Sequence, residues 1–301
     1  MKIAVTGGTG FIGHYVLRRL ASAGHSLRAW YRPASDRSGL EEINVEWLSG
    51  ELNDEKASQL LVAGCDAVVH AALFRPGIGF RGAEGDLIEF AERNVVGTLR
   101  LIEAARQAQV KRFVFLSTCA VHEQILEDRP LDENHPTRAT SHYGAHKAAI
   151  EQFVHSYGLG TGFSICALRP TGVFGLAHHH QDSKWLDLVR AVVKGEAVHC
   201  QRGGKEVHAA DVAKAVELLL NAAASAVTGE AFNCYDRYVS EWDVAHLAKQ
   251  MSGSNAEIRG HQTAPKDQII TAKLRSLGMV FGGQQLLEAT VRQLVEAVGS
   301  N

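Results

Sequence analysis

A tyrosine and a lysine four residues apart form the pair of side chains in this sequence that is best suited to acid–base chemistry. Tyr143 and Lys147 stand in the run YGAHK and share one face if the segment is helical. Thr140 or Ser141 as N-cap and the following run Ala148–Val154 favour a helix. A phenol titrates at about pH 10 in water, and a neighbouring ammonium stabilises the phenolate. This pairing prepares Tyr143 to act as a general acid or base at neutral pH.

A hydroxyl side chain lies upstream, at the end of an expected strand. Ser117 and Thr118 close the apolar run that starts at Arg112, and Thr118 precedes Tyr143 by 25 residues. A hydroxyl at that point can hydrogen-bond the substrate oxygen that Tyr143 would protonate. We take Thr118 rather than Ser117 for this role, so the predicted catalytic set is Thr118, Tyr143 and Lys147.

A glycine-rich turn follows the first apolar run. In TGGTGFIG, Gly7, Gly10 and Gly13 are each three residues apart, and a helical pattern begins directly after them. Glycine permits a sharp turn, a close approach of the backbone to a pyrophosphate and tight packing of helix on strand, while the helix N-terminus supplies N–H donors. The turn therefore predicts a bound dinucleotide. His14 stands where a Walker-type phosphate loop would have lysine, which excludes that motif.

The end of the second expected strand predicts which dinucleotide binds. The segment AWYRP has no Asp or Glu that would hydrogen-bond the 2′-hydroxyl of an adenosine ribose, and it has Arg32 instead. A guanidinium pairs with a 2′-phosphate, whereas a carboxylate would repel it. The prediction is NADP, with NAD as the alternative cofactor and a solvated loop arginine as the competing interpretation of Arg32.

Short apolar runs that alternate with helical patterns must position these residues. The runs expected to be strands are Lys2–Thr6, Leu27–Tyr31, Val45–Leu48, Ala67–Ala71, Arg112–Ser117 and Phe163–Leu168. Parallel strands need crossover connections, which are nearly always right-handed. The economical fold is therefore α/β, a doubly wound parallel sheet with helices on both faces and ligands at the carboxyl ends of the strands.

A helix between the fourth and fifth strands should present one apolar stripe to the sheet. Its members recur at steps of three and four residues: Leu87, Ile88, Ala91, Val95, Leu99 and Ile102. From about Pro170 the alternation weakens, and an amphipathic stretch, Gln284–Val298, closes the chain. We predict a dinucleotide-binding domain at 1–169 and a smaller, mixed α/β substrate domain at 170–301.

Composition excludes several classes of protein. The 301 residues are 46% hydrophobic and 21% charged, as in ordinary globular proteins. A net charge of -2 provides no basic field for nucleic acid. The cysteines are dispersed without a CxxC spacing, and the sequence shows neither a signal-peptide pattern nor 18 consecutive apolar residues. We expect a cytoplasmic protein that binds no membrane.

Taken together, the motifs resemble those of the extended short-chain dehydrogenase/reductase family, also called the NAD-dependent epimerase/dehydratase family. The resemblance covers nearly the whole chain and implies a Rossmann fold. Besides the glycine turn and the Tyr–Lys pair, it rests on NVVGT from Asn94, FVFLST ending at Thr118, LRPTGVFG from Leu168 and VHAADVA from Val207. It implies hydride transfer between a nicotinamide cofactor and a carbinol or carbonyl substrate. Reduction, epimerisation and dehydration all start from this step, and the sequence leaves the three open.

The resemblance also implies which residues contact the cofactor. Gly7, Gly10, Phe11, Ile12 and Gly13 would line the pyrophosphate, Glu51 and Leu52 would flank the adenine, Ala71, Ala72 and Asn94 would approach its middle, and Pro170 and Thr171 would pack by the nicotinamide. Lys147 would hold the nicotinamide ribose and also tune Tyr143. The expected partner is a small-molecule substrate, with a homodimer left open.

Two departures from the family pattern concern the substrate. Val121-His122-Glu123 stands where the family usually has Val-Tyr-Gly. Nucleotide-sugar members hold the diphosphate with an asparagine and an arginine at the places of Gly172 and Gly204. We therefore expect weak or no binding of uridine-diphosphate sugars, unless Arg202 or Lys205 substitutes.

Two loops could steer a smaller substrate. Ala72–Gly85, with Arg75 and Arg81, is either a lid or a plain surface loop. His178–His180 lies just after the Gly175 turn and lacks an accompanying carboxylate cluster, so we expect no metal there. The alternatives to the epimerase/dehydratase type are a carbonyl reductase of the dihydroflavonol-reductase-like type and a non-catalytic NADP-sensing module, which would typically lack the tyrosine or the lysine.

Overall fold

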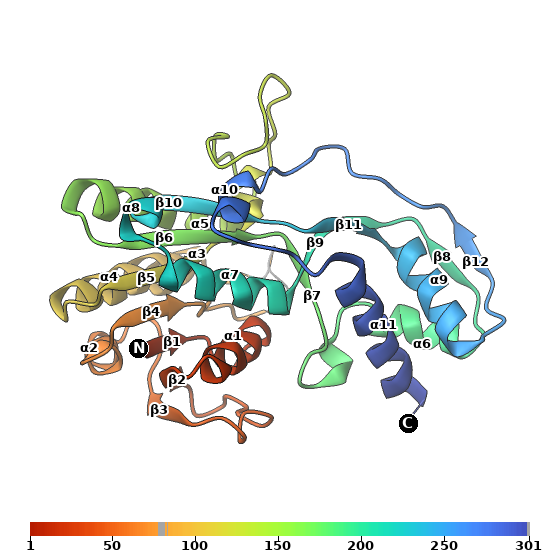
Figure 1. Ribbon diagram of the computed structural model, residues 1–301, viewed down its shortest axis with the longest axis horizontal. Coiled ribbons are helices and arrows are strands. Elements are labelled where there is room, and N and C mark those ends of the chain that lie inside the picture. The colour runs from red at the N-terminus through yellow and green to blue at the C-terminus, as the bar shows by residue number, and fades with distance from the viewer. Residues whose placement is uncertain (78–81, 83, 300–301) are drawn as a thin grey trace. The chain divides into compact units, whose positions relative to one another are not determined.

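The computed structural model describes residues 1–77, 82 and 84–299 (Figure 1). The chain forms two compact units. Unit 1 comprises Met1–Pro170, Val212–Cys234 and Ile269–Met279, and unit 2 comprises Thr171–Asp211, Tyr235–Gln268 and the residues from Val280 onward. The division expected from the sequence is a single one between residues 169 and 170, whereas the first segment of unit 1 ends at Pro170 and the chain returns twice to this unit, where later strands and helices complete its sheet and core.

Unit 1 contains a parallel sheet in the order β10-β6-β5-β4-β1-β2-β3 within the described residues. Its strands are β1 (Lys2–Thr6), β2 (Ser26–Tyr31), β3 (Val45–Ser49), β4 (Ala67–His70), β5 (Arg112–Leu116), β6 (Ile165–Pro170) and β10 (Glu230–Cys234). The predicted doubly wound α/β fold and its six strands are confirmed. The edge strand β10, which pairs with β6, was not predicted from the sequence.

The strand register places the predicted site residues at one edge of this sheet. Thr6 pairs with His70, and His70 pairs with Phe115 on the next strand. Because the strands are parallel, the segments that follow their carboxyl ends leave the sheet at the same edge. The glycine turn, Ala71 and Thr118 belong to these segments.

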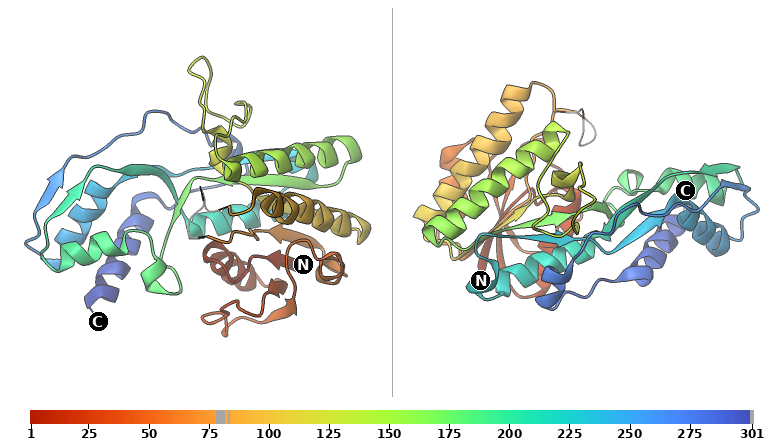
Figure 2. Two further views of the ribbon diagram at one scale, coloured as in Figure 1. Left: turned by 180° about the vertical axis from the view of Figure 1, so that it is seen from behind. Right: turned by 90° about the horizontal axis from the view of Figure 1, so that it is seen from above.

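Helices cover both faces of the sheet (Figures 1 and 2). They are α1 (Phe11–Ser22), α2 (Glu55–Val62), α3 (Leu87–Ala91), α4 (Gly97–Gln107), α5 (His142–His155), α7 (Ala209–Asn221), α8 (Ala224–Val227) and α10 (Ala272–Ser276). Leu61 of α2, Leu101 of α4 and Ile150 of α5 share one buried core with the strand residues Val68 and Phe113. Figure 2 shows α4 and α5 side by side, on the face opposite α1 and α7.

The predicted apolar stripe of the helix before β5 is wrong at its start. Leu87 and Ile88 are 43% and 69% exposed, and Phe90 is buried instead. The cause is a π-helical turn, Glu92–Val96, which joins α3 to α4. A π turn adds a residue and rotates the buried face, so a stripe counted at α-helical steps does not apply across it.

Unit 2 is built from short strands and three helices in its described part. β7 (Gly172–Phe174), β9 (Gly203–His208) and β11 (Arg237–Ser240) form one sheet, and β8 (Val198–Cys200) pairs with β12 (Ile258–Gly260). The helices α6 (Leu186–Val193), α9 (Glu241–Ser252) and α11 (Gly283–Gly299) enclose a separate core that includes Val189, Val244 and Val291. The amphipathic stretch predicted at Gln284–Val298 is thus a helix. In the described part of the chain, no helix has the length and apolar character needed to cross a membrane.

Candidate active site

The glycine turn between β1 and α1 leaves no room for side chains. Gly7 has φ +71°, and a Cβ on it would lie 2.6 Å from the carbonyl carbon of Ala71. A Cβ on Gly13 would lie 2.0 Å from the carbonyl oxygen of Gly7. Gly10 N–H donates to the same oxygen at 3.0 Å, which closes the turn. Helix and strand therefore approach as closely as the sequence pattern predicted.

The first turn of α1 is suited to an anion. Gly10 is the N-cap, and no side chain among the described residues caps the helix there. The first turn, which starts with Phe11 and Ile12, carries no acidic residue. Uncapped N–H groups at the positive end of a helix dipole bind phosphate groups. A close turn with uncapped N–H groups fits the pyrophosphate of a dinucleotide.

A buried histidine, which the sequence interpretation missed, fixes the strand ends beside this turn. His70 Nε2 contacts Thr98 Oγ1 at 2.8 Å, and its Nδ1 contacts Thr6 Oγ1 at 2.6 Å. Thr98 donates its own proton to Asn94 O, so His70 carries its proton on Nε2 and accepts from Thr6 at Nδ1. Burial, with Lys147 as the second cause, lowers the pKa of His70 to about 3. The ring is therefore a neutral structural link.

Asn94 acts on the segment after β4. Its amide nitrogen donates to the carbonyl oxygens of Phe74 and Phe90 at 2.9 and 3.0 Å, and its Oδ1 accepts from Phe74 N–H at 2.8 Å. Thr6 Oγ1 accepts from Ala72 N–H at 3.2 Å. These contacts hold the backbone that follows Ala71. Asn94, which was expected near the cofactor, therefore supports this backbone segment.

Cationic side chains gather after β2. Arg32 is exposed, and its backbone N–H donates to Ser35 Oγ at 3.0 Å. Arg37, which the sequence interpretation did not single out, lies over the ring of Tyr31 at 4.4 Å and near Trp47. The end of β2 therefore offers two guanidinium groups to an anionic ligand.

The residues expected beside the adenine lie after β3. Glu51 forms a partly exposed ion pair with Arg93 at 3.2 Å, and Leu52 is buried. Both line an open hollow of about 810 Å³ together with residues of α2 and of the α3 segment. Gly50 N–H donates to Tyr31 O at 3.1 Å, which ties this segment to the end of β2.

The helix α5 presents the predicted tyrosine and lysine. Of the two expected N-caps, Ser141 has the role, and its hydroxyl accepts from Gly144 N–H at 3.0 Å. Tyr143 is partly exposed, whereas Lys147 is buried. The Lys147 ammonium donates to Leu116 O at 2.7 Å and lies 4.6 Å from the centre of the Phe115 ring. Burial lowers the pKa of Lys147 to about 7, against the opposing attraction of Glu151.

The two hydroxyl residues at the end of β5 have different partners. Ser117 donates to Oε1 of Glu151 inside the core. Thr118 begins a short 3₁₀ turn, Cys119–His122, where its Oγ1 accepts from Ala120 N–H at 3.1 Å. The hydroxyl proton of Thr118 is not used by that bond, because Oγ1 is the acceptor.

A buried network extends from α5 to the unusual residue His122. Arg169 contacts both carboxylate oxygens of Glu151, with Nε at 3.0 Å from each. Arg169 Nη1 also donates to His122 Nε2 at 3.0 Å, so that histidine carries its proton on Nδ1, towards Pro136 O. Burial, with Arg169 as the second cause, lowers the pKa of His122 to about 4.

The two residues expected by the nicotinamide fall at the end of unit 1 and the start of unit 2. Pro170 is the last residue of β6 and pairs with Cys234. Thr171 opens unit 2, and its buried Oγ1 has no hydrogen-bond partner among the described residues.

A carboxylate fills the space beside Gly172 and Gly204 in unit 2. A Cβ on Gly172 would lie 2.7 Å from Glu206 Oε2, and a Cβ on Gly204 would lie 2.5 Å from Glu206 Oε1. Glu206 is only 3% exposed and pairs with Lys184. Burial raises the pKa of Glu206, and Lys184 opposes this effect. Arg202, one of the two expected substitutes for a phosphate ligand, pairs with Glu241 at 3.2 Å.

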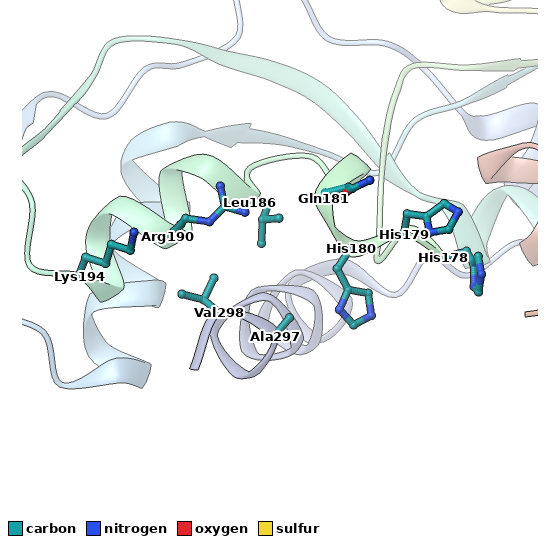
Figure 3. A pocket seen from close by; sticks show the side chains of 9 residues that line it. All are labelled: His178, His179, His180, Gln181, Leu186, Arg190, Lys194, Ala297 and Val298. Atoms are coloured by element: carbon teal, nitrogen blue, oxygen red, sulfur yellow. The ribbon is translucent and has the colours of Figure 1, made fainter. Parts of the chain in front are cut away.

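The three consecutive histidines lie on a cavity within unit 2. His178–His180 line it with Gln181, with Leu186, Arg190 and Lys194 from the α6 region, and with Ala297 and Val298 of α11 (Figure 3). Its volume is about 530 Å³. Residues 78–81 and 83 of the expected lid, Arg81 among them, lie outside the described residues.

Comparison with known proteins finds a matching family model and similar enzymes. Residues 3–234 match the model of the NAD dependent epimerase/dehydratase family. A 4-hydroxy-2-methyl-3-oxo-4-farnesyl-3,4-dihydroquinoline-1-oxide ketoreductase of Stigmatella aurantiaca is 31% identical over 77% of this chain and 67% of its own length. The dTDP-D-glucose 4,6-dehydratase of Mus musculus is 29% identical over 83% of this chain and 72% of its own length.

Solved structures share the fold. The UDP-glucose 4-epimerase of Thermus thermophilus in complex with NAD has a TM-score of 0.78 and 24% identity, with 99% of both chains covered. The UDP-glucose 4-epimerase of Thermotoga maritima, solved with UDP-glucose, has a TM-score of 0.80 and 22% identity, with 100% of this chain and 99% of that chain covered.

Proposed function

The chain belongs to the NAD-dependent epimerase/dehydratase family, and from this premise we propose that it catalyses hydride transfer between a nicotinamide dinucleotide and a small carbinol or carbonyl compound. The observation that carries the proposal is the placement of Lys147. Its buried ammonium donates to the carbonyl of Leu116, the last residue of β5, and Lys147 lies one helical turn after Tyr143 on α5. Thr118 follows the same strand two residues later.

The proposed roles follow from the donors and acceptors of these side chains. When bound, the nicotinamide supplies the hydride acceptor or donor. Tyr143 takes a proton from the substrate hydroxyl or gives one to the substrate carbonyl oxygen. Lys147 stabilises the phenolate by its charge. Thr118 donates its unused hydroxyl proton to the same substrate oxygen, and Ser117 is excluded from this role because it serves Glu151.

The cofactor proposed is NADP. Arg32 is exposed at the end of β2, and Arg37 adds a second positive charge in the same segment. A 2′-phosphate gains charge-assisted hydrogen bonds from such groups, while no carboxylate follows Tyr31 directly to bind a 2′-hydroxyl. NAD is the alternative cofactor, and titration of the protein with both dinucleotides distinguishes the two.

The substrate proposed is a carbonyl or hydroxyl compound without a nucleotide diphosphate. Glu206 places a buried carboxylate between Gly172 and Gly204, and a diphosphate at that place would meet a negative charge. The ketoreductase of Stigmatella aurantiaca, by its name, acts on such a compound and supports this assignment.

The experiment is single-turnover reduction of a panel of carbonyl compounds with NADPH, by the wild type and by Tyr143→Phe. We expect turnover to fall by about 10² or more in the variant, as for the loss of a general acid, with NADPH affinity nearly unchanged. Lys147→Ala should reduce both turnover and affinity. Wild-type rates in Tyr143→Phe would refute the role of the tyrosine, and the absence of turnover with every compound would favour a dinucleotide sensor.

A further inference from the structure

Glu123 joins the segment that carries Thr118 to the helix that carries Tyr143. Its Oε2 accepts hydrogen bonds from the backbone N–H groups of Thr140 and Ser141, at 2.5 and 2.7 Å. The hydroxyl groups of the same two residues donate to its carboxylate at 3.0 Å each. Four donors from two consecutive residues therefore converge on one side chain.

The contact lies at the start of α5. The Ser141 hydroxyl donates to Glu123 Oε1 and accepts from Gly144 N–H, so it links the carboxylate to the first helical turn. A negative charge at this end of a helix is favoured by the helix dipole. Burial acts to raise the pKa of Glu123, but the hydrogen bonds outweigh it and keep the pKa below its usual range. The carboxylate therefore stays ionised and remains an acceptor.

The packing around this contact is close. A Cβ on Gly144 would lie 2.6 Å from the carbonyl oxygen of Ala120 and 2.8 Å from Cβ of Ala139. The residue beside Tyr143 is thus pressed against the turn that follows Thr118. A small displacement of that turn changes the place of Tyr143, because no flexible side chain separates the two backbones.

A second bond ties the other side of Thr118 to the same helix. Ser117 donates to Glu151, which lies two turns further along α5 than Tyr143. Thr118 therefore lies between Ser117 and Glu123, and both of these residues hydrogen-bond to α5 or to its N-cap, Ser141.

We propose that Glu123 is a positioning residue, which sets the place of Tyr143 relative to Thr118 by binding the N-terminus of α5. The inference rests on the proposed function only for its kinetic readout. The proposal gives a role to Glu123, which stands where the family usually has glycine. Its carboxylate fixes the position of Tyr143 relative to Thr118, the two residues that would handle the proton.

The kinetic test compares Glu123→Ala and Glu123→Gln with the wild type. We expect kcat to fall at least tenfold in Glu123→Ala, because misplacement of reacting groups by about 1 Å costs up to about 10² in rate. Glu123→Gln keeps one acceptor oxygen and should recover part of the loss. NADPH affinity should stay within twofold in both, because the glycine turn is elsewhere in unit 1. A kcat within twofold of the wild type in Glu123→Ala overturns the proposal.

The matched control is Gln124→Ala. Gln124 is the exposed neighbour of Glu123, and its backbone N–H donates to Arg138 O at 3.0 Å, a bond that the substitution retains. Its kcat should equal that of the wild type. An equal loss in Gln124→Ala would mean that any change in this loop lowers the rate, and would overturn the specific role of Glu123.

A structural measurement separates this inference from the proposed function. Amide hydrogen exchange at Thr140, Ser141 and Gly144 should accelerate at least tenfold in Glu123→Ala and not in Gln124→Ala, whether or not a substrate is found. Faster exchange with unchanged kcat would refute positioning while leaving the hydride-transfer proposal intact. A Tyr143→Phe variant as active as the wild type would refute the proposed function instead, and the exchange measurement would still test the contact between Glu123 and α5.

Discussion

Arg169 donates from Nη2 to Oε2 of Glu151 at 2.6 Å, and the two side chains are only 2% and 1% exposed. The guanidinium also reaches His122, and the carboxylate also receives the proton of Ser117. A fully buried ion pair is costly to form but far more costly to break, because the remaining charge is left without a partner. This pair therefore joins β6 to α5, the helix that carries Tyr143 and Lys147.

Breaking this pair should destabilise the protein strongly. We expect Glu151→Gln to lower the free energy of unfolding by about 3–5 kcal/mol, because it leaves the Arg169 charge buried and poorly compensated. Urea unfolding of the variant and the wild type gives the value. The matched control is Glu103→Gln, which removes an exposed pair with Arg106 at 2.9 Å and should cost about 0–1 kcal/mol. Equal losses in the two variants would contradict the network.

The buried lysine should make stability depend on pH. Lys147 has a pKa of about 7 in the folded protein, against about 10.4 in the unfolded chain. Between these values the unfolded chain binds a proton that the folded protein does not, so the free energy of unfolding rises with pH.

Comparison with Lys147→Met isolates this effect. From about pH 7 to about pH 9 the wild type should gain about 2 kcal/mol relative to the variant, measured by denaturant unfolding without dinucleotide. The gain should continue towards pH 10 at a smaller slope. A difference that stays constant with pH, or that falls as pH rises, would show that Lys147 remains charged in the folded protein.

Thr118 and Ser117 should respond differently to the loss of a hydroxyl. Thr118→Ala should lower kcat/KM by about 10², as for the loss of a hydrogen-bond donor to the reacting oxygen. Ser117→Ala should instead lower the free energy of unfolding by about 1.5–3 kcal/mol, through its lost hydrogen bond to the Glu151 carboxylate, with a smaller loss of rate than in Thr118→Ala. Steady-state kinetics and urea unfolding of both variants provide the measurements, and the reverse pattern would exchange the two roles.

Arg32 should determine the choice of dinucleotide. The wild type should bind NADP more tightly than NAD, and Arg32→Ala should narrow the difference by about 1.5–3 kcal/mol, the range of a hydrogen bond to a charged group. Titration of both dinucleotides measures the two affinities. Arg129→Ala, which removes an exposed arginine paired with Asp128, is the control and should change neither. Equal affinities of the wild type for NAD and NADP would refute the assignment.

Glu206 should exclude a diphosphate. Calorimetry with uridine diphosphate should detect no micromolar binding to the dinucleotide-loaded wild type, because a buried carboxylate stands between Gly172 and Gly204. Glu206→Gln removes the negative charge beside Lys184 and should raise the affinity. Micromolar binding to the wild type that Arg202→Ala abolishes would instead show that Arg202 holds the phosphate by another path.

The sequence by itself determined the elements and motifs whose signals are local. Five neighbouring strands were predicted from the apolar runs that start at Lys2, Leu27, Val45, Ala67 and Arg112. Short apolar runs that alternate with helical periodicity can be recognised from consecutive residues alone. The spacing of the glycines predicted the turn at Gly7, because the φ of +71° and the close approach to Ala71 exclude side chains. The spacing of Tyr143 and Lys147 likewise placed both on one helix.

Only the tertiary structure decided which partners these residues have. Ser117 and Thr118 are adjacent and chemically alike, and the packing of β5 against α5 commits one of them to Glu151. The place of β10 beside β6 and the bonds of Glu123 to Thr140 depend on segments that meet only after folding. A hydrogen bond or a buried charge pair forms between groups that lie far apart in the sequence. The spacing of neighbouring residues therefore does not reveal it.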